Sequence, residues 1–213
     1  MTVGIIPVGM LGTNCYIIKT DGESCAVVDP GAQPERIIRE LEELRAVPRM
    51  ILLTHGHHDH IGGVKKLMAR YPDAVLYIGK GDAEMLGDTQ KSLAVFRNSD
   101  DSDFVIGNAR TLADGDVLQL EELEIRVLET PGHTKGGVTY LCEDAMFAGD
   151  TLFYGDVGRT DLYGGDYTTL LRSLRKLAEV EGDYRVYPGH GDSTTLQFER
   201  QNNSYIQEAL KGR

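Results

Sequence analysis

Four of the six histidines in this 213-residue sequence fall within six consecutive positions, in the run His-Gly-His-His-Asp-His at residues 55–60. The apolar stretch Met50–Leu53 just before this run predicts a short buried strand, so the histidines follow the carboxyl end of that strand. A turn at this point can direct alternate side chains at one position and the next pair at a second position nearby. The run therefore predicts a loop that contributes ligands to two metal ions.

The other two histidines also follow predicted strands. His133 lies in Pro-Gly-His-Thr (131–134) and His190 lies in Pro-Gly-His-Gly (188–191), where the adjacent glycines allow the backbone to approach closely. Asp150, in Ala-Gly-Asp-Thr (148–151), follows a strand as well, and its two carboxylate oxygens suit it to bridge two cations.

Each of these residues has an ordinary alternative when taken alone. An isolated histidine at position 133 or 190 is more often a surface or hydrogen-bonded residue, and an isolated aspartate at position 150 is more often a turn residue. Five histidines and two aspartates at strand ends nevertheless supply enough ligands for two sites of four or five ligands each, with room for water. The combination favours a two-metal centre. We interpret His58, which lies outside the ligand spacing, as a packing residue or a support for a ligand.

The hydrophobic pattern divides the chain into two strand-rich halves, each with amphipathic helical segments. Strands are expected at 3–8, 14–18, 26–28, 50–53, 75–78, 117–120, 124–128, 138–141, 145–147 and 184–187, and helices near 34–44, 64–69, 81–86, 166–177 and from 195 onward. Two such halves predict packed sheets covered by helices on the outside, in one α/β domain over residues 1–213. The polar, acidic run 87–103 is expected to be a surface excursion.

Charge and cysteine content narrow the class of partner. The formal net charge is −11, from 33 acidic and 22 basic side chains, which disfavours nucleic acid and favours a small-molecule substrate. The sequence shows no leader pattern and no long apolar stretch, so we expect neither export nor membrane association, and a cytoplasmic location. Cys15, Cys25 and Cys142 form no C-x-x-C pair, which indicates neither a disulfide framework nor a thiolate metal cluster.

With the 55–60 run followed in order by His133, Asp150 and His190, the sequence resembles the metallo-β-lactamase superfamily over nearly its whole length. Within it, the chain is similar to the short glyoxalase II-like, or hydroxyacylglutathione hydrolase-like, group. Four stretches carry this closer match: Gly-Thr-Asn-Cys-Tyr at 12–16, Val-Asp-Pro-Gly at 28–31, Gly-Asp-Thr-Leu-Phe at 149–153 through Gly-Arg-Thr-Asp at 158–161, and Gly-His-Gly-Asp-Ser-Thr-Thr at 189–195. The resemblance implies a four-layer αββα sandwich with the site between the edges of the two sheets.

The resemblance also implies a role for each site residue. One metal would be held by His55, His57 and His133, and the other by Asp59, His60 and His190, with Asp150 bridging the two. Asp29 would brace the histidine loop without binding metal, and Asp59 would also orient the attacking hydroxide. Arg159 falls where the group has a basic residue near the substrate, although it is equally well read as a salt-bridge partner.

The chain departs from glyoxalase II proper in two ways. Asp161 stands where glyoxalase II has an aromatic hydroxyl donor. The resemblance does not extend to the C-terminal helical domain that supplies much of the glutathione pocket in those enzymes, since the sequence ends about twenty residues after His190. A glutathione preference is therefore left open.

The expected chemistry is hydrolysis of a thioester, such as the 2-hydroxyacyl thioester lactoylglutathione. Two divalent ions, zinc foremost with iron or manganese as alternatives, would supply a bridging hydroxide, and the thiolate would leave without a general acid. The alternative from another class is an iron-dependent persulfide dioxygenase, which the chain resembles at residues 158–161. A β-lactamase, a nuclease and a binding module without activity are less well supported by the same motifs.

Overall fold

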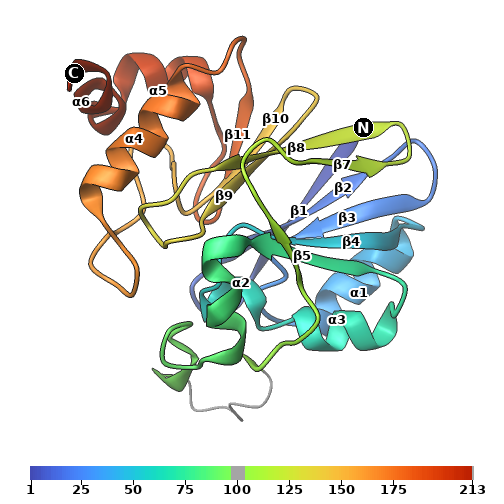
Figure 1. Ribbon diagram of the computed structural model, residues 1–213. Coiled ribbons are helices and arrows are strands. Elements are labelled where there is room, and N and C mark those ends of the chain that lie inside the picture. The colour runs from blue at the N-terminus through green and yellow to red at the C-terminus, as the bar shows by residue number, and fades with distance from the viewer. Residues whose placement is uncertain (97–103, 213) are drawn as a thin grey trace.

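The computed structural model describes residues 1–96 and 104–212, and two six-stranded sheets form its centre (Figure 1). The first sheet has the strand order β1-β2-β3-β4-β5-β6, with β1 to β3 antiparallel and β3 to β6 parallel. Its strands are β1 (Thr2–Val8), β2 (Thr13–Lys19), β3 (Ser24–Val28), β4 (Val47–Leu53), β5 (Val75–Gly79) and β6 (Arg110–Leu112). Because β3 and the second half of β4 are buried on both faces, they are continuous apolar runs rather than alternating ones.

The second sheet has the order β12-β11-β10-β9-β8-β7, and only its β10–β11 pair is parallel. Its strands are β7 (Val117–Leu120), β8 (Leu123–Glu129), β9 (Val138–Cys142), β10 (Ala145–Gly149), β11 (Arg185–Pro188) and β12 (Thr194–Thr195). The side chains of β9 and β10 are buried throughout, because this sheet is also covered on both of its faces.

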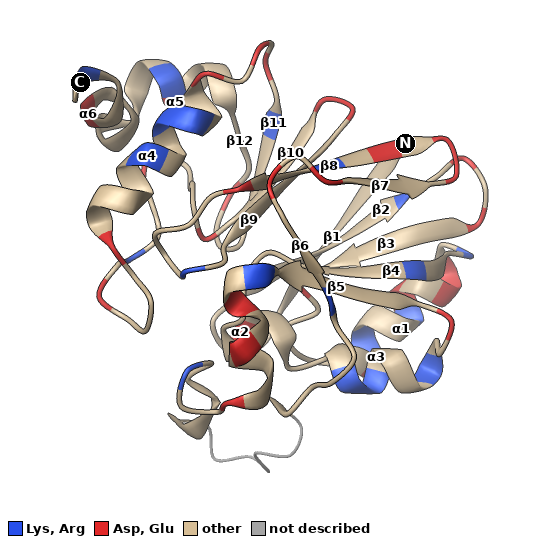
Figure 2. Cartoon of the chain, in the orientation of Figure 1, with Lys and Arg blue, Asp and Glu red and all other residues tan. Residues whose placement is uncertain are grey.

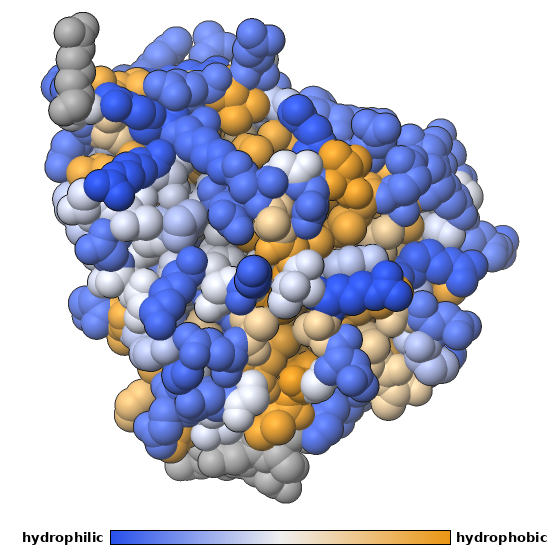
Figure 3. All heavy atoms as spheres, in the orientation of Figure 1, coloured by the Kyte–Doolittle hydropathy of each residue, from blue (hydrophilic) through white to orange (hydrophobic). Residues whose placement is uncertain are grey.

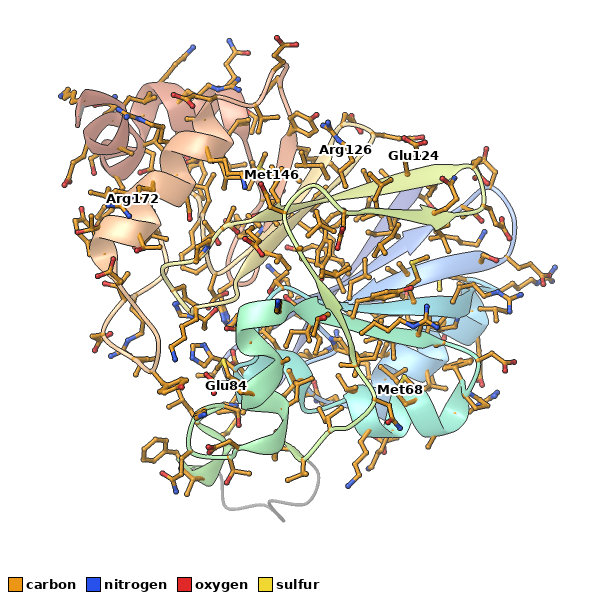
Figure 4. All side chains as sticks on the ribbon, in the orientation of Figure 1. Met68, Glu84, Glu124, Arg126, Met146 and Arg172 are labelled. Atoms are coloured by element: carbon orange, nitrogen blue, oxygen red, sulfur yellow. The ribbon has the colours of Figure 1, made fainter. Side chains whose placement is uncertain are left out.

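Helices cover the outer face of each sheet (Figure 1). The helices are α1 (Pro34–Glu43), α2 (His58–Ile61), α3 (Val64–Arg70), α4 (Tyr167–Ala178), α5 (Leu196–Asn202) and α6 (Ser204–Lys211), with the 3₁₀ helices η1 (Lys80–Gly87) and η2 (Ala94–Phe96). Met68 of α3 packs against the core beneath the first sheet, and Met146 of β10 lies in the core between the second sheet and α4 (Figure 4). The four layers confirm the predicted αββα sandwich.

The two sheets enclose a third core between them. Tyr16, Phe147 and Tyr187 meet there, with ring centroids 5.1 to 5.4 Å apart. Tyr140 is fully buried in the same layer, and its hydroxyl donates to the Leu53 carbonyl 2.7 Å away. This bond fixes the end of β4, from which the histidine run continues, against the opposite sheet.

The carboxyl ends of β3, β4, β10 and β11 lead into residues that the sequence analysis predicted to bind metal or to support the metal ligands. Contacts between the beginning of β2 and the segment after β11 close this end of the sandwich, since Asn14 N–H donates to the Gly189 carbonyl at 2.8 Å. Thr13 forms a β-bridge with His190 in the same place. Segments from both halves of the chain therefore reach one location.

Three details differ from the sequence-based expectation. The short edge strands β6 and β12 were not predicted, because two or three residues give no usable periodicity. The segment expected to be a helix at 81–86 is the 3₁₀ helix η1. The expectation of a surface excursion at 87–103 is wrong for part of its described residues, because Ser92 and Ala94 are fully buried. The Ser92 carbonyl accepts from His58 N–H at 2.8 Å, and Ala94 belongs to the hydrophobic core beneath the first sheet. Residues 97–103 lie outside the described residues.

Charged side chains lie mainly on the outer helices and on the turns between strands, while most of the strand ribbon carries none (Figure 2). The face in Figure 3 is largely hydrophilic, with apolar side chains visible between the polar ones across its middle. Among the described residues, none of the helices combines the length and the apolar character needed to cross a membrane.

Candidate metal centre

The histidine run changes conformation at its midpoint. His57 is extended, with φ −70° and ψ 147°, and α2 begins at the next residue. His55 and His57 thus lie in the irregular segment between β4 and α2, whereas Asp59 and His60 lie on the first turn of α2. The segment after β3 packs tightly on this turn: a Cβ at Gly31 would lie 1.5 Å from the Asp59 carbonyl oxygen, so only glycine fits there.

Asp29 supports the histidine run through hydrogen bonds, as predicted. One carboxylate oxygen accepts from Thr54 N–H at 2.8 Å, and the other accepts from the Thr54 hydroxyl at 2.6 Å and faces His60 Nδ1 at 2.9 Å. Because the Thr54 proton is committed to Asp29, its oxygen accepts from His55 Nδ1, 3.0 Å away. The Nε2 atoms of His55 and His60 are thereby left to face the centre.

His55, His57 and His133 form the first potential ligand group, with one ring nitrogen from each lying within 4.8 Å of the others. His57 Nδ1 is 2.9 Å from His133 Nε2. On the opposite side of its ring, His133 Nδ1 lies 2.7 Å from the Arg159 carbonyl. A carbonyl only accepts, so Nδ1 carries the proton and Nε2 presents its lone pair.

Asp59, His60 and His190 form the second group. Asp59 Oδ2 is 3.3 Å from His190 Nε2 and 3.5 Å from His60 Nε2. The Thr13 hydroxyl donates to the same carboxylate oxygen at 2.9 Å, and His190 Nδ1 lies 3.1 Å from the Leu11 carbonyl. The first residue of β2 therefore orients Asp59, and the loop before it orients His190.

Asp150, at the end of β10, lies between the two groups. Its Oδ1 is 3.4 Å from His60 Nε2, and its Oδ2 is 3.5 Å from both His133 Nε2 and His190 Nε2. The structure therefore brings all seven predicted metal-binding residues together, while none of the candidate groups within the described ranges includes His58.

The donor set fits a pair of divalent cations. His55 Nε2 and Asp150 Oδ1 are buried, and neither has a hydrogen-bond partner in the part of the chain that the structure describes. Such atoms cost about 1–3 kcal/mol each when left unsatisfied, whereas coordination to a cation would satisfy both. Imidazole and carboxylate donors without thiolate suit zinc, iron or manganese.

Without a bound ion, four histidines of the centre fall into two sets, one with lowered and one with raised pKa values. Burial lowers the pKa of His55 and, with His133 beside it, lowers that of His57 to about 3. Burial also lowers the pKa of His60 and His190, but Asp59 and Asp150 outweigh this and raise the two values to about 9 and about 10. Burial alone would raise the pKa of Asp59 and Asp150; the facing histidines instead hold both below the usual range.

Arg159 lies beside the centre through its backbone rather than its side chain. The Arg159 side chain is 63% exposed, and its guanidinium forms a bidentate pair with Asp161, at 2.6 and 2.7 Å. This is the salt-bridge arrangement that the sequence allowed as one of two readings.

The sequence reading did not identify two supporting residues. Thr13 follows the glycine of the turn before β2, and its contact with Asp59 spans 46 positions. Asp82 lies at the beginning of η1 and is fully buried. The one available signal for Asp82 was its place just after a strand, which Asp29 and Asp150 share.

A model of the metallo-β-lactamase superfamily matches residues 8–190 of the chain. The chain belongs to the metallo-β-lactamase superfamily. Hydroxyacylglutathione hydrolase GloC of Haemophilus influenzae is 32% identical to this chain over 218 residues, which cover 97% of this chain and 98% of that protein.

Two solved structures resemble this superfamily member in both fold and sequence. The B3 metallo-β-lactamase BLEG-1 has a TM-score of 0.87 at 32% identity, covering 96% of this chain and 99% of its own. TTHA1623 in a di-iron-bound form has a TM-score of 0.80 at 32% identity, covering 95% and 99%. Relatives of nearly the same length thus share the fold, and one of them holds two metal ions.

Replacement of Asp150 tests the bridging role. Asp150→Ala should lose bound metal and reduce activity by more than the roughly 100-fold that loss of a supporting partner typically costs, since it removes a carboxylate next to both groups. Elemental analysis should find about two ions per chain in the wild type. His58→Ala is the matched control in the same loop and should retain both; loss of an ion from that variant would show that the assignment of ligands in the loop is wrong.

Metal binding should strengthen with pH. His60 and His190 must release the protons that their raised pKa values retain at neutral pH, so the dissociation constant for zinc should fall by up to about tenfold per pH unit for each displaced proton. In the metal-free protein the sign is opposite: the stability contributed by these histidines is complete below pH 6.5 and is lost as pH rises through about 9 and 10. Calorimetry in buffers of different ionisation enthalpy measures the released protons, and an affinity that is constant from pH 6.5 to 8.5 would contradict this description.

Proposed function

We propose that this superfamily member is a binuclear metal-dependent thioester hydrolase that acts on 2-hydroxyacyl thioesters such as lactoylglutathione. The observation that carries the proposal is the similarity to GloC, which extends over essentially the full length of both chains. The convergence of seven histidine and aspartate side chains at the end of the sandwich is consistent with it. The proposed substrate is a small molecule, with neither nucleic acid nor a membrane as partner.

We assign one ion to His55, His57 and His133 and the other to Asp59, His60 and His190, with Asp150 shared by both. When bound, two divalent ions supply hydroxide at neutral pH, polarise the thioester carbonyl and stabilise the negative charge that develops on its oxygen. Zinc is the expected metal, and the di-iron form of TTHA1623 keeps iron in consideration.

Asp59 is the proposed residue for orienting the nucleophilic water. Its pKa lies well below the usual range, so the carboxylate is ionised and can accept a hydrogen bond from the water at any working pH. The Thr13 hydroxyl holds Oδ2 at 2.9 Å, and the side chain is only 13% exposed. Its orientation is therefore fixed before substrate arrives, which lowers the cost of aligning the attack.

A thioester suits this set of residues because its leaving group is stable as an anion. A thiol has a pKa of about 8.5, so the thiolate departs near neutral pH without receiving a proton first. An amide, by contrast, needs a proton on its departing nitrogen. The raised pKa values of His60 and His190 arise from the carboxylates of the centre and would be lost on metal binding, so these histidines are not assigned as general acids.

The rim of the centre consists of the loop at Met10 and Leu11, of Phe153, and of the Arg159–Asp161 pair. It offers apolar and charged surface to the two halves of a substrate. Leu11 and Met10, 60% and 91% exposed, lie in the loop whose carbonyl contacts His190, and Phe153 packs edge-on to the same imidazole at 6.2 Å. Arg159 remains the proposed contact for a carboxylate on the thiol half. Because Arg159 is already paired with Asp161, the substrate carboxylate would have to share the guanidinium with Asp161 or displace Asp161 from it.

Thioester cleavage in the absence of oxygen tests the proposal. Protein loaded with zinc or manganese should hydrolyse lactoylglutathione anaerobically with kcat/KM above about 10⁴ M⁻¹ s⁻¹, the lower end for enzymes on their own substrates. Iron-loaded protein given glutathione persulfide should consume no oxygen. The thiol released from the thioester can be followed continuously with a thiol reagent.

Two other outcomes identify the rival functions. Oxygen consumption with persulfide at a rate well above thioester cleavage would replace the proposal with the persulfide dioxygenase. The similarity to BLEG-1 makes a β-lactam the necessary second control, and hydrolysis of a chromogenic cephalosporin faster than any thioester would favour a lactamase. Asp59→Asn should lose thioester cleavage in the same assay if Asp59 orients the nucleophile.

A further inference from the structure

Asp82 is a buried carboxylate that lies outside the proposed ligand set. It is 0% exposed at the beginning of η1, directly after β5, and it accepts three hydrogen bonds. Gly136 N–H donates to Oδ1 at 2.7 Å, and the Thr134 hydroxyl and Gly56 N–H donate to Oδ2 at 2.7 and 3.1 Å. A buried carboxylate is costly unless it is satisfied in this way, so its position is tightly determined.

The three donors belong to two separate loops that carry ligands. Gly56 lies between His55 and His57, while Thr134 is the residue after His133. One carboxylate therefore connects the backbones of the two segments that supply the whole first group. Their separation in sequence is 76 residues from His57 to His133, and Asp82 belongs to neither segment.

Glycines bring these segments into close contact with η1. A Cβ at Gly136 would lie 2.1 Å from Asp82 N, and one at Gly79 would lie 2.0 Å from the Gly136 carbonyl oxygen. A Cβ at Gly56 would lie 2.6 Å from Met85 Cβ. Side chains at these positions would separate the backbones, so glycine permits the approach that places Asp82 within reach of both loops.

The outer surface of the same junction has a second set of links. Glu84, two residues after Asp82, pairs with Lys135 at 3.3 Å and accepts from the Tyr163 hydroxyl at 2.8 Å; Figure 4 shows Glu84 on the green segment that includes η1. The side chains of Glu84 and Lys135 are 42% and 52% exposed, so these contacts contribute little on their own. Asp82 is the buried connection between the loops.

Asp29 and Asp82 divide the support of the centre between them. Asp29 contacts the His60 ring directly and the His55 ring through Thr54. Asp82 instead accepts its hydrogen bonds from two backbone amides and one hydroxyl, so it acts on the ligands through the loops that carry them.

We propose that Asp82 is a positioning residue that holds the His55–His57 segment at a fixed distance from His133 and thereby sets the affinity of the three-histidine site for its ion. The proposal rests on the metal centre assigned above but not on the thioester chemistry, because its test measures metal binding. Asp82 touches neither ion nor substrate, and loss of its carboxylate should affect the first site more than the second.

Asp82→Asn is the direct test. The amide keeps the size of the side chain but presents an N–H₂ group to at least one of the three donors, so the two loops lose a common acceptor. Cobalt(II), whose visible absorption reports ligand geometry, is the probe, and chelator competition measures affinity. One of the two cobalt ions should bind about 10- to 100-fold more weakly, with a changed spectrum, as is typical when a residue that supports ligands is lost.

Glu199→Gln is the matched control. Glu199 is also 0% exposed and accepts from a backbone amide, Gly155 N–H at 3.0 Å, and from a threonine hydroxyl, Thr194 at 2.7 Å, but within the described residues it has no hydrogen bond to either of the two segments that supply the first group. This variant should lose thermal stability and keep both ions and the wild-type cobalt spectrum. If Asp82→Asn behaves in the same way as Glu199→Gln, Asp82 is a structural residue only and the proposal is overturned.

Thr134→Val keeps the test decisive if Asp82→Asn does not fold. This substitution removes one donor to Asp82. We expect one of the two cobalt ions to bind about 2- to 10-fold more weakly than in the wild type, which is the effect of one hydrogen bond. Wild-type affinity for both cobalt ions in folded Thr134→Val would overturn the proposal. A wild-type protein that binds two ions but cleaves no thioester would instead count against the proposed function alone.

Discussion

The arrangement of this end of the protein depends on buried carboxylates that face buried histidines. Asp59 and Asp150 lie among the ring nitrogens of His60, His133 and His190 at 3.3 to 3.5 Å, and these five side chains are only 0 to 26% exposed. Charges in such a place are costly unless each is paired or coordinated. The fold meets this requirement by bringing strand ends from both sheets to one point.

That requirement explains several features that packing alone would not. Gly31 permits the Asp59 turn to lie directly on the segment after β3, and Asp29 then reaches both Thr54 and His60. Each of His60, His133 and His190 has its Nδ1 occupied by a carboxylate or a carbonyl, which directs Nε2 at the centre. The ring orientations are therefore set by the protein before any ion binds, which is the usual task of partners behind metal ligands.

The sequence predicted the parts of this structure that have a local signature. The buried strands and the 55–60 run could be identified because apolar runs and ligand spacing are short-range patterns, and the αββα sandwich followed from the resemblance that these motifs carry. Asp82 could not be identified, because its role exists only where β5, the histidine loop and the His133 loop meet in space. Buried Ser92 and Ala94 were missed for a similar reason: small residues in a polar run give no periodicity, and their burial comes from contacts distant in sequence, with the histidine loop for Ser92 and with the core beneath the first sheet for Ala94.

In the proposed function, the ligand set and its supports limit the chemistry, and the residues around the centre would select the substrate. One fold can host many reactions: GloC is a hydroxyacylglutathione hydrolase and BLEG-1 is a B3 metallo-β-lactamase, although each is 32% identical to this chain. The site residues rather than the fold must therefore support the assignment. The exposed apolar loop at Met10 and the Arg159–Asp161 pair are the parts of this rim where specificity would reside.

Anomalous diffraction from crystals of zinc-loaded protein tests the central claim most directly. Data collected on both sides of the zinc absorption edge should give two peaks, one among His55, His57 and His133 and one among Asp59, His60 and His190, with Asp150 adjacent to both. A single peak in fully loaded crystals, or a second peak outside these residues, would contradict the two-metal centre described here.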